Sequence, residues 1–168
     1  AETALVEEAA SFRDNMTEAR HSAYLATLRR KAGAYPNDPF ALGLLADAEF
    51  AAEDYAAARA NADRLLALDP SGSHAMLLKG MLLVEEAGDA EDTAEQVKIA
   101  EARKLILAAN RAEPDNPQPF LAYYRSFRVS GEAVPDKAIE GLMQAVGTVP
   151  QDPGARMMLV EALADKRR

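Results

Sequence analysis

Between Pro39 and Pro70 the chain reads PFALGLLADAEFAAEDYAAARANADRLLALDP. Alanine and leucine dominate this stretch and β-branched residues are sparse. That composition favours helix over strand, because alanine loses no side-chain entropy in a helix. A polar break at Glu53-Asp54 separates two apolar runs. The stretch therefore predicts two helices, over 38–51 and 55–68, that end at a proline.

The same ending recurs along the chain. Spacings of 34, 44 and 36 residues separate the closing prolines, which are Pro36, Pro70, Pro114 and Pro150. Three of the four are soon followed by Asp or Asn and then a second proline: Asp38-Pro39, Asn116-Pro117 and Asp152-Pro153. The side-chain oxygen caps the first amides of a helix, and proline lacks an amide that would need a partner there. Each repeat thus ends, and the next begins, within a few residues.

Nine helices are expected from this pattern, at 3–15, 18–33, 38–51, 55–68, 73–87, 93–112, 117–130, 135–148 and 153–166. Short loops predict that neighbouring helices pack antiparallel, as helical hairpins. The first pair is a degenerate repeat, in which Thr17 is expected to cap the second helix.

At these positions the chain resembles the tetratricopeptide repeat family, over roughly residues 37–166. The small residue Ala58, the aromatic Tyr55 and the closing Pro70 carry the resemblance best; Glu49 and Lys79 depart from it. The resemblance implies an all-α fold, a right-handed superhelix of about nine antiparallel helices in one domain, 1–168. Its parts are expected to be a degenerate helix pair (1–36), repeats 37–70, 71–114 and 115–150, and a last helix (151–168) that is either a terminal helix or the start of a truncated repeat.

Composition excludes several classes of function. The net charge is −8, which disfavours binding to nucleic acid or anionic membrane surfaces. No stretch approaches the ~20 apolar residues that span a bilayer. The chain has no Cys. That absence excludes disulfides and leaves the compartment open between the cytoplasm and the bacterial periplasm.

Searching for catalytic or metal-binding motifs finds none that is complete. The two histidines, His21 and His74, fall on different expected helices without zinc-ligand spacing. The acidic stretch Asp89–Glu95 lacks calcium-loop spacing, and is expected to be an insertion loop that caps the next helix. We therefore expect no enzyme activity, no cofactor and no metal.

The resemblance also implies a binding surface, since first helices of tetratricopeptide proteins line a concave groove. The residues at the lining positions that we select as candidates are Phe40, Asp47, Phe50, His74, Leu77, Met81, Leu121, Arg125 and Arg128. This set suits an extended peptide or helix with apolar anchors and an acidic group. The alternative is that Leu77, Met81, Val84 and Leu121 belong to the core between repeats. Gly43 and Asp47 stand where a carboxylate clamp has Lys and Asn, which argues against that binding mode.

The sequence thus predicts a scaffold that binds a protein or peptide in this groove. One alternative is a non-catalytic repeat appendage of a larger bacterial enzyme or transport-linked protein; the first residue is Ala, not Met. The other is a homodimer through the last helix. That helix is apolar on more than one side, at Met157, Met158, Leu159, Val160 and Leu163.

Overall fold

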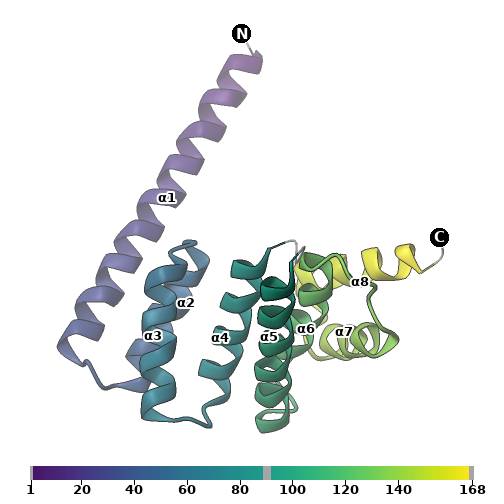
Figure 1. Cartoon of the computed structure of the whole chain (residues 1–168). Coiled ribbons are helices and arrows are strands. Elements are labelled where there is room, and N and C mark those ends of the chain that lie inside the picture. Colours follow the sequence, from purple (N-terminus) through teal and green to yellow (C-terminus); the bar gives the residue numbers. More distant parts are fainter. Residues whose placement is uncertain (1, 89–91, 167–168) are drawn as a thin grey trace. The chain divides into compact units, whose positions relative to one another are not determined.

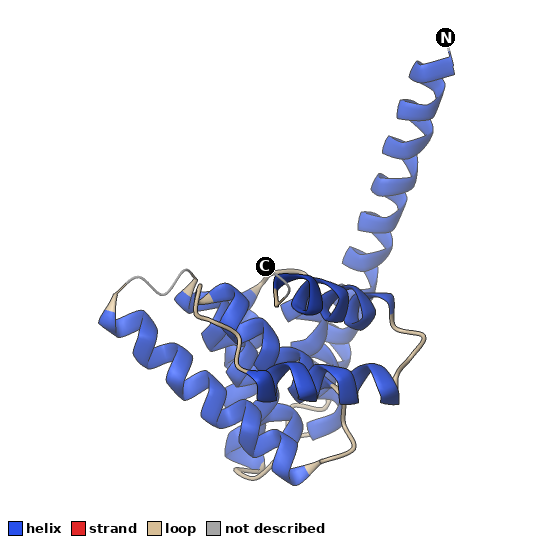
Figure 2. Cartoon of the chain, turned by 90° about the vertical axis from the view of Figure 1, so that its right-hand side faces the viewer, coloured by secondary structure: helices blue, strands red, loops and turns tan. Residues whose placement is uncertain are grey.

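The computed structural model describes the backbone of residues 2–88 and 92–166, and the side chains of 17–88 and 92–166. Within these residues there are eight α-helices and no strand (Figures 1 and 2). The helices are α1 (Glu2–Ala34), α2 (Pro39–Ala51), α3 (Tyr55–Leu68), α4 (Ser73–Ala87), α5 (Thr93–Ala112), α6 (Gln118–Val129), α7 (Asp136–Thr148) and α8 (Pro153–Asp165).

Helix boundaries follow the capping residues that the sequence predicted. Asp38 accepts a hydrogen bond from the amide of Phe40, and Asn116 accepts one from the amide of Gln118. Asp152 accepts from the first amides of α8. The caps at Asp38 and Asp152 are confirmed, because each satisfies an amide that has no partner inside its helix. At α6 the N-cap is Pro117, and Asn116 binds the Gln118 amide from one residue further out.

The insertion before α5 provides another cap. Asp92 and Glu95 form a reciprocal capping box, in which each side chain accepts from the backbone amide of the other. The expected capping role of the acidic stretch is therefore confirmed at these two residues. Residues 89–91 of that stretch lie outside the described part of the chain.

The expected helix pair at the start of the chain is wrong, which accounts for eight described helices in place of nine. One helix, α1, runs without a break from Glu2 to Ala34. Thr17 lies inside it and does not start a second helix. The physical reason is that residues 14–18 contain neither Gly nor Pro, so no residue there forces the helix to end.

The chain divides into two compact units, Ala1–Asn61 and Ala62–Arg168, with the division inside α3. In the first unit α1 packs against α2. The core of this contact includes Leu28 and Ala32 from α1 and Leu45 from α2. The single domain expected from the sequence stays a prediction.

In the second unit α4 packs against both α5 and α6, α5 packs against α6, and α7 packs against α6 and α8. Apolar residues of α4 and α5, with Ala122 of α6, form one core cluster. A second cluster joins α6, α7 and α8 through residues that include Leu121, Leu142 and Ala155. Two apolar clusters, which both include residues of α6, thus hold the helices of this unit together.

Two helices of the second unit cross closely because one of them carries a glycine. At Gly80 of α4, an added Cβ would lie 2.7 Å from the Cγ1 of Ile106 and 3.0 Å from the carbonyl oxygen of Ala102, both on α5. A Cβ that close to another heavy atom forces its neighbours to shift, because the interior is already close-packed. Gly80 therefore sets how closely α4 and α5 approach.

We predict that Gly80→Ala destabilises the protein by about 1–2 kcal/mol, although alanine is the better helix former, because the backbone of α5 must move. Gly147→Ala, in α7 of the same unit, is the matched control. Nothing lies within 4 Å of a Cβ at Gly147, so that change is expected to stabilise by up to about 0.5–1 kcal/mol. Urea unfolding followed by far-UV circular dichroism measures both. A Gly80→Ala chain as stable as the parent would show that the crossing has room for a methyl group.

Candidate functional site: exposed faces of the first unit

The first unit carries an open cavity between α1 and α2. Its volume is about 700 Å³. Residues of α1 and of the C-terminal end of α2 line it: Thr17, Glu18, His21, Ser22, Tyr24, Leu25, Ala48, Ala51 and Ala52. Leucine, alanine and a half-exposed tyrosine ring provide apolar surface, and the other side chains of α1 provide a polar edge. Such a mixture of apolar floor and polar edge is typical of a binding surface.

A polar network holds the two walls of this cavity together. Glu49 of α2 is 2 % exposed, yet it is charged. Its carboxylate accepts a hydrogen bond from Arg29 Nε of α1 at 3.2 Å and another from Asn61 Nδ2 of α3 at 2.7 Å. Arg29 also donates to Asp54 at 2.6 Å. Because a buried carboxylate needs partners, this network fixes where α1 lies against α2.

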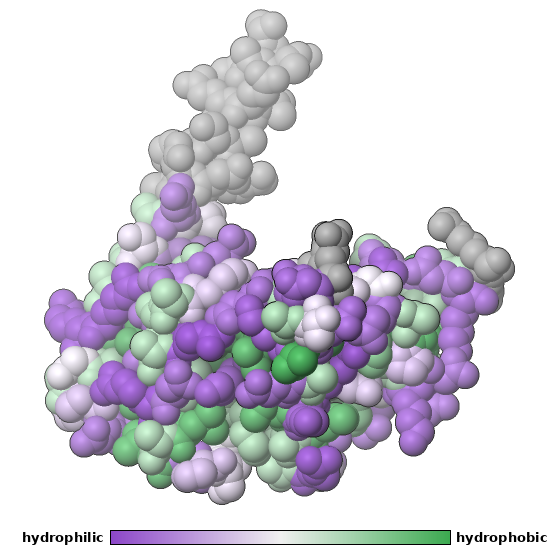
Figure 3. Space-filling model, in the orientation of Figure 1, coloured by the Kyte–Doolittle hydropathy of each residue, from purple (hydrophilic) through white to green (hydrophobic). Residues whose placement is uncertain are grey.

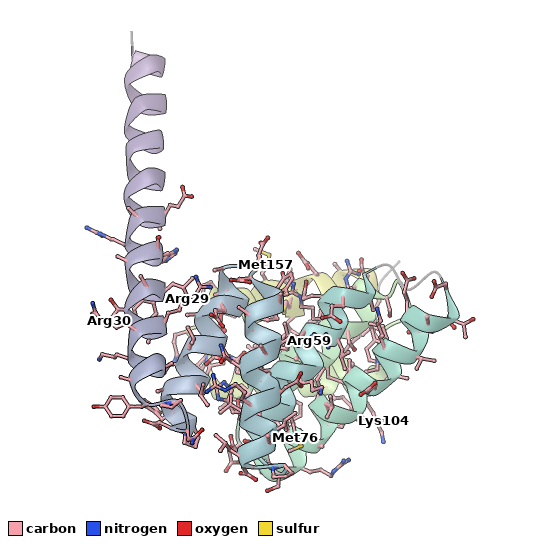
Figure 4. The ribbon with its side chains drawn as sticks, turned by 60° about the vertical axis from the view of Figure 1, so that its left-hand side comes forward. Arg29, Arg30, Arg59, Met76, Lys104 and Met157 are labelled. Carbon is pink, nitrogen blue, oxygen red and sulfur yellow. The ribbon has the colours of Figure 1, made fainter. Side chains whose placement is uncertain are left out.

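The departures from the family pattern at Glu49 and Lys79 are explained by such partners. Glu49 binds Arg29 and Asn61, while Lys79 of α4 forms an ion pair with Asp63 at 2.7 Å. Arg30, the next residue of α1, projects away from Arg29 in the view of Figure 4. Arg30 is exposed.

The exposed candidate residues of the first unit lie on α2. Phe40 is 74 % exposed, and Asp47, seven residues later, is also exposed. Leu44 and Ala51, at the same helical spacing, are exposed as well. These four positions share one face of α2, because residues three, four and seven apart are neighbours on a helix. Phe50 is half-buried, and its ring centroid is 5.5 Å from that of Tyr55.

In the second unit, α4 has little free surface. Leu77 is 5 % exposed, and its neighbour in the core cluster, Val84, is 2 % exposed. Leu121 of α6 is 8 % exposed and belongs to the other cluster. Met81 is half-buried and His74 is exposed. Leu77 and Leu121 therefore contribute to the core, which was the alternative interpretation of their spacing.

Both candidate cations of α6 have carboxylate partners within the chain. Arg125 pairs with Glu85 of α4 at 2.8 Å, and Arg128 pairs with Asp165 of α8 at 2.8 Å. Each arginine side chain is about half exposed. An acidic group of a binding protein would therefore have to displace Glu85 or Asp165 from these arginines.

A further arginine, which sequence reasoning missed, joins α5 to α6. Arg103 donates to the hydroxyl of Ser126, to its carbonyl oxygen, and to the hydroxyl of Ser130. It also binds Glu132 at 2.9 Å, and its guanidinium lies 3.7 Å from the ring centroid of Phe127. The hydrogen bond from Arg103 lowers the pKa of Glu132 below its usual range. Its partners come from a distant part of the sequence, so no local pattern signals this role.

A smaller cavity, of about 270 Å³, lies among α6, α7 and α8. Tyr124 lines it and is 2 % exposed, and burial raises the pKa of its hydroxyl. The cations at its edge are paired: Arg128 with Asp165, and Lys166 with Asp136. This arrangement holds the helices together and leaves no excess charge that would select a ligand.

The last helix exposes an apolar face. Met157 is 59 % exposed, Val160 62 % and Leu163 42 %. On the face of the molecule that Figure 3 shows, green apolar areas lie among purple hydrophilic ones. Self-association through α8 stays a prediction.

No three His, Asp or Glu side chains among the described residues are placed to hold a metal ion. In the same part of the chain, no helix is both long enough and apolar enough to cross a membrane.

Solved structures with similar folds identify the architecture. A thermophilic tetratricopeptide repeat protein of Thermus thermophilus, TTC0263, has a TM-score of 0.74 and 25 % identity, over 88 % of this chain and 75 % of that one. The chain has a tetratricopeptide-repeat-like fold.

Other tetratricopeptide-like neighbours agree on the fold. MamA of Desulfovibrio magneticus RS-1 has a TM-score of 0.61 and 22 % identity, over 88 % of this chain and 76 % of that one. A further MamA crystal structure has a TM-score of 0.60 and 16 % identity, over 89 % and 81 %. No protein-family model matches the sequence, and no curated protein does. The expected all-α, tetratricopeptide-like helical repeat is confirmed.

We predict that Arg29→Ala destabilises the packing of α1 on α2 by about 2 kcal/mol. The change removes one partner of the buried Glu49 carboxylate, and the effect stays moderate because the Arg29 side chain is about half exposed to solvent. Arg30→Ala, the same change at the next residue, is expected to alter stability by less than about 0.5 kcal/mol. Hydrogen exchange of the α2 amides, followed by mass spectrometry, measures the difference as a roughly 30-fold faster opening. Equal exchange in the two variants would contradict the role assigned to Arg29.

Proposed function

We propose that this chain is a protein-binding scaffold without catalytic activity of its own, and that a peptide or helix of its partner binds along the exposed face of α2. The observation that carries the proposal is the tetratricopeptide-like fold together with Phe40, which remains 74 % exposed on a first helix. A large aromatic side chain in water is a favourable anchor for a partner, because its burial releases about 2–3 kcal/mol.

The chemistry of the α2 face narrows the kind of partner. Phe40 and Leu44 provide apolar contact. Asp47 lies on the same face of α2, about one turn after Leu44 and two turns after Phe40. An apolar side chain followed by a basic one, spaced by about one helical turn, would complement that order. The basic group also suits the charge of the whole chain, which is −8.

The proposal gives less weight to the other candidate residues. Leu77 and Leu121 are buried in the core, while Arg125 and Arg128 bind carboxylates of neighbouring helices. Recognition of an acidic group by the two arginines would need those internal pairs to open. The first unit therefore offers the more accessible surface.

We predict that Phe40→Glu and Asp47→Lys each lower capture of the partner by about tenfold or more, because they replace an apolar anchor and reverse a charge. Chemical crosslinking of the tagged full chain in extracts of its source cells, followed by mass spectrometry, measures capture. Leu68→Glu is the control, since Leu68 of α3 is also exposed (45 %) but lies outside the candidate set. Far-UV circular dichroism must show that all three variants fold. If both α2 variants capture the same proteins in the same amounts as the parent, the α2 face is not the binding surface.

A further inference from the structure

The open cavity between α1 and α2 is suited to packing against a third helix. One wall consists of Ala48 and Ala51 of α2 and of Ala52, the residue after that helix, and their small side chains let another backbone approach closely. Its α1 wall follows successive turns of one helix, from Thr17 to Leu25. Helices of the second unit do pack against several others: α6, for example, contacts α4, α5 and α7.

The sequence before the cavity supplies a segment of suitable length and pattern. Residues 2–16 are helical, and a helix of this length measures about 22 Å. In the sequence, apolar residues recur at Leu5, Ala9, Phe12 and Met16, which is the spacing of an amphipathic helix. A helical hairpin that turned near Thr17 would lay this segment along the cavity. That hairpin is the arrangement the sequence alone predicts.

The unbroken α1 prevents that contact within one chain. The helix continues in a straight line from the cavity wall to Glu2, and Figure 1 shows its N-terminal end extending beyond α2. A segment that points away from its own cavity can still reach the same cavity on another molecule. Exchange of identical elements between copies is a common route to dimers when a hinge stays extended.

We propose that residues 2–16 of a second copy of this chain fill the cavity between α1 and α2, and that the exchange is reciprocal. Each copy donates one helix and accepts one, as two-fold symmetry requires. Reciprocal exchange doubles the surface that one docked helix would bury, and a larger buried surface favours a stable dimer. The cavity meets the α2 face only at Ala51, since Phe40, Leu44 and Asp47 do not line it; the exchange can therefore be tested apart from binding at Phe40.

Disulfide trapping tests the exchange directly, because the chain has no Cys of its own. A tagged Ala9→Cys chain is mixed with an untagged Ala51→Cys chain under mild oxidation. We expect the tagged–untagged crosslinked dimer to form about tenfold more than with the control pair, in which Ala60→Cys replaces Ala51→Cys. Ala60 is an exposed alanine of α3 that does not line the cavity.

Two outcomes of the trapping experiment overturn the proposal. One is no excess of the crosslinked dimer over the control pair. The other is a chain carrying both Ala9→Cys and Ala51→Cys that closes on itself as a monomer, since the segment would then fill its own cavity.

Sedimentation of the full chain at about 100 µM provides the second test. The parent is expected to be a dimer, whereas Ala51→Arg and Phe12→Glu are expected to be monomers, since one blocks the cavity and the other places a charge in the donated helix. Ala60→Arg and Val160→Glu should remain dimers. A monomeric parent overturns the proposal. So does a dimer that survives Ala51→Arg and Phe12→Glu but is lost in Val160→Glu, because association would then run through α8.

Discussion

Close approach of helices at small side chains is the constraint on which the second unit depends. Gly80 brings α4 against the backbone of α5, and the buried alanines Ala102 and Ala109 lie in the same core cluster. Close crossings let the larger side chains of α4 and α5 interdigitate, which is how a small helical unit reaches native packing density. Gly141 plays a similar part between α7 and α6, where an added Cβ would lie 2.7 Å from the ring of Phe120. The repeated small residues therefore determine the spacing of the helices as well as their formation.

Polar groups in the first unit have a different role from the apolar core, because they select one arrangement. Apolar contacts between α1 and α2 tolerate a shift along the helix, since leucine and alanine can pack against several neighbours. The carboxylate of Glu49 does not, because it must meet Arg29 and Asn61 together. A buried charged group that is satisfied in one arrangement penalises the others. The same reasoning applies to Arg103, whose partners on α6 and beyond it fix α5 against that helix.

Much of the fold could be predicted from the sequence, because its boundaries are local signals. Pro36, Pro114 and Pro150 each follow the end of a helix, and a capping residue begins the next one soon after. The observed ends of the later helices therefore lie close to the predicted ones. The break expected near Thr17 rested on a capping residue alone. A threonine can lie inside a helix when no glycine or proline ends it, so the cap was not decisive. The candidate site was harder to predict, since lining and core residues of a repeat follow the same helical spacing. Leu77 is buried because α5 and α6 cover α4, and the local sequence does not encode those contacts.

The contrast between α4 and α2 has a consequence for where a partner can bind. Apolar residues occur all round α4, a pattern that requires neighbours on every side, and its buried positions, from Ala75 to Ala87, confirm such neighbours. On α2 the buried residues are confined to one side, from Leu42 to Glu49, while Phe40, Leu44 and Asp47 remain exposed. Exposed apolar side chains that gather on one helix face often mark an interaction surface. The surface of α2, and not the buried residues of α4, is therefore where this structure leaves apolar groups exposed, which is why the proposed binding face lies there.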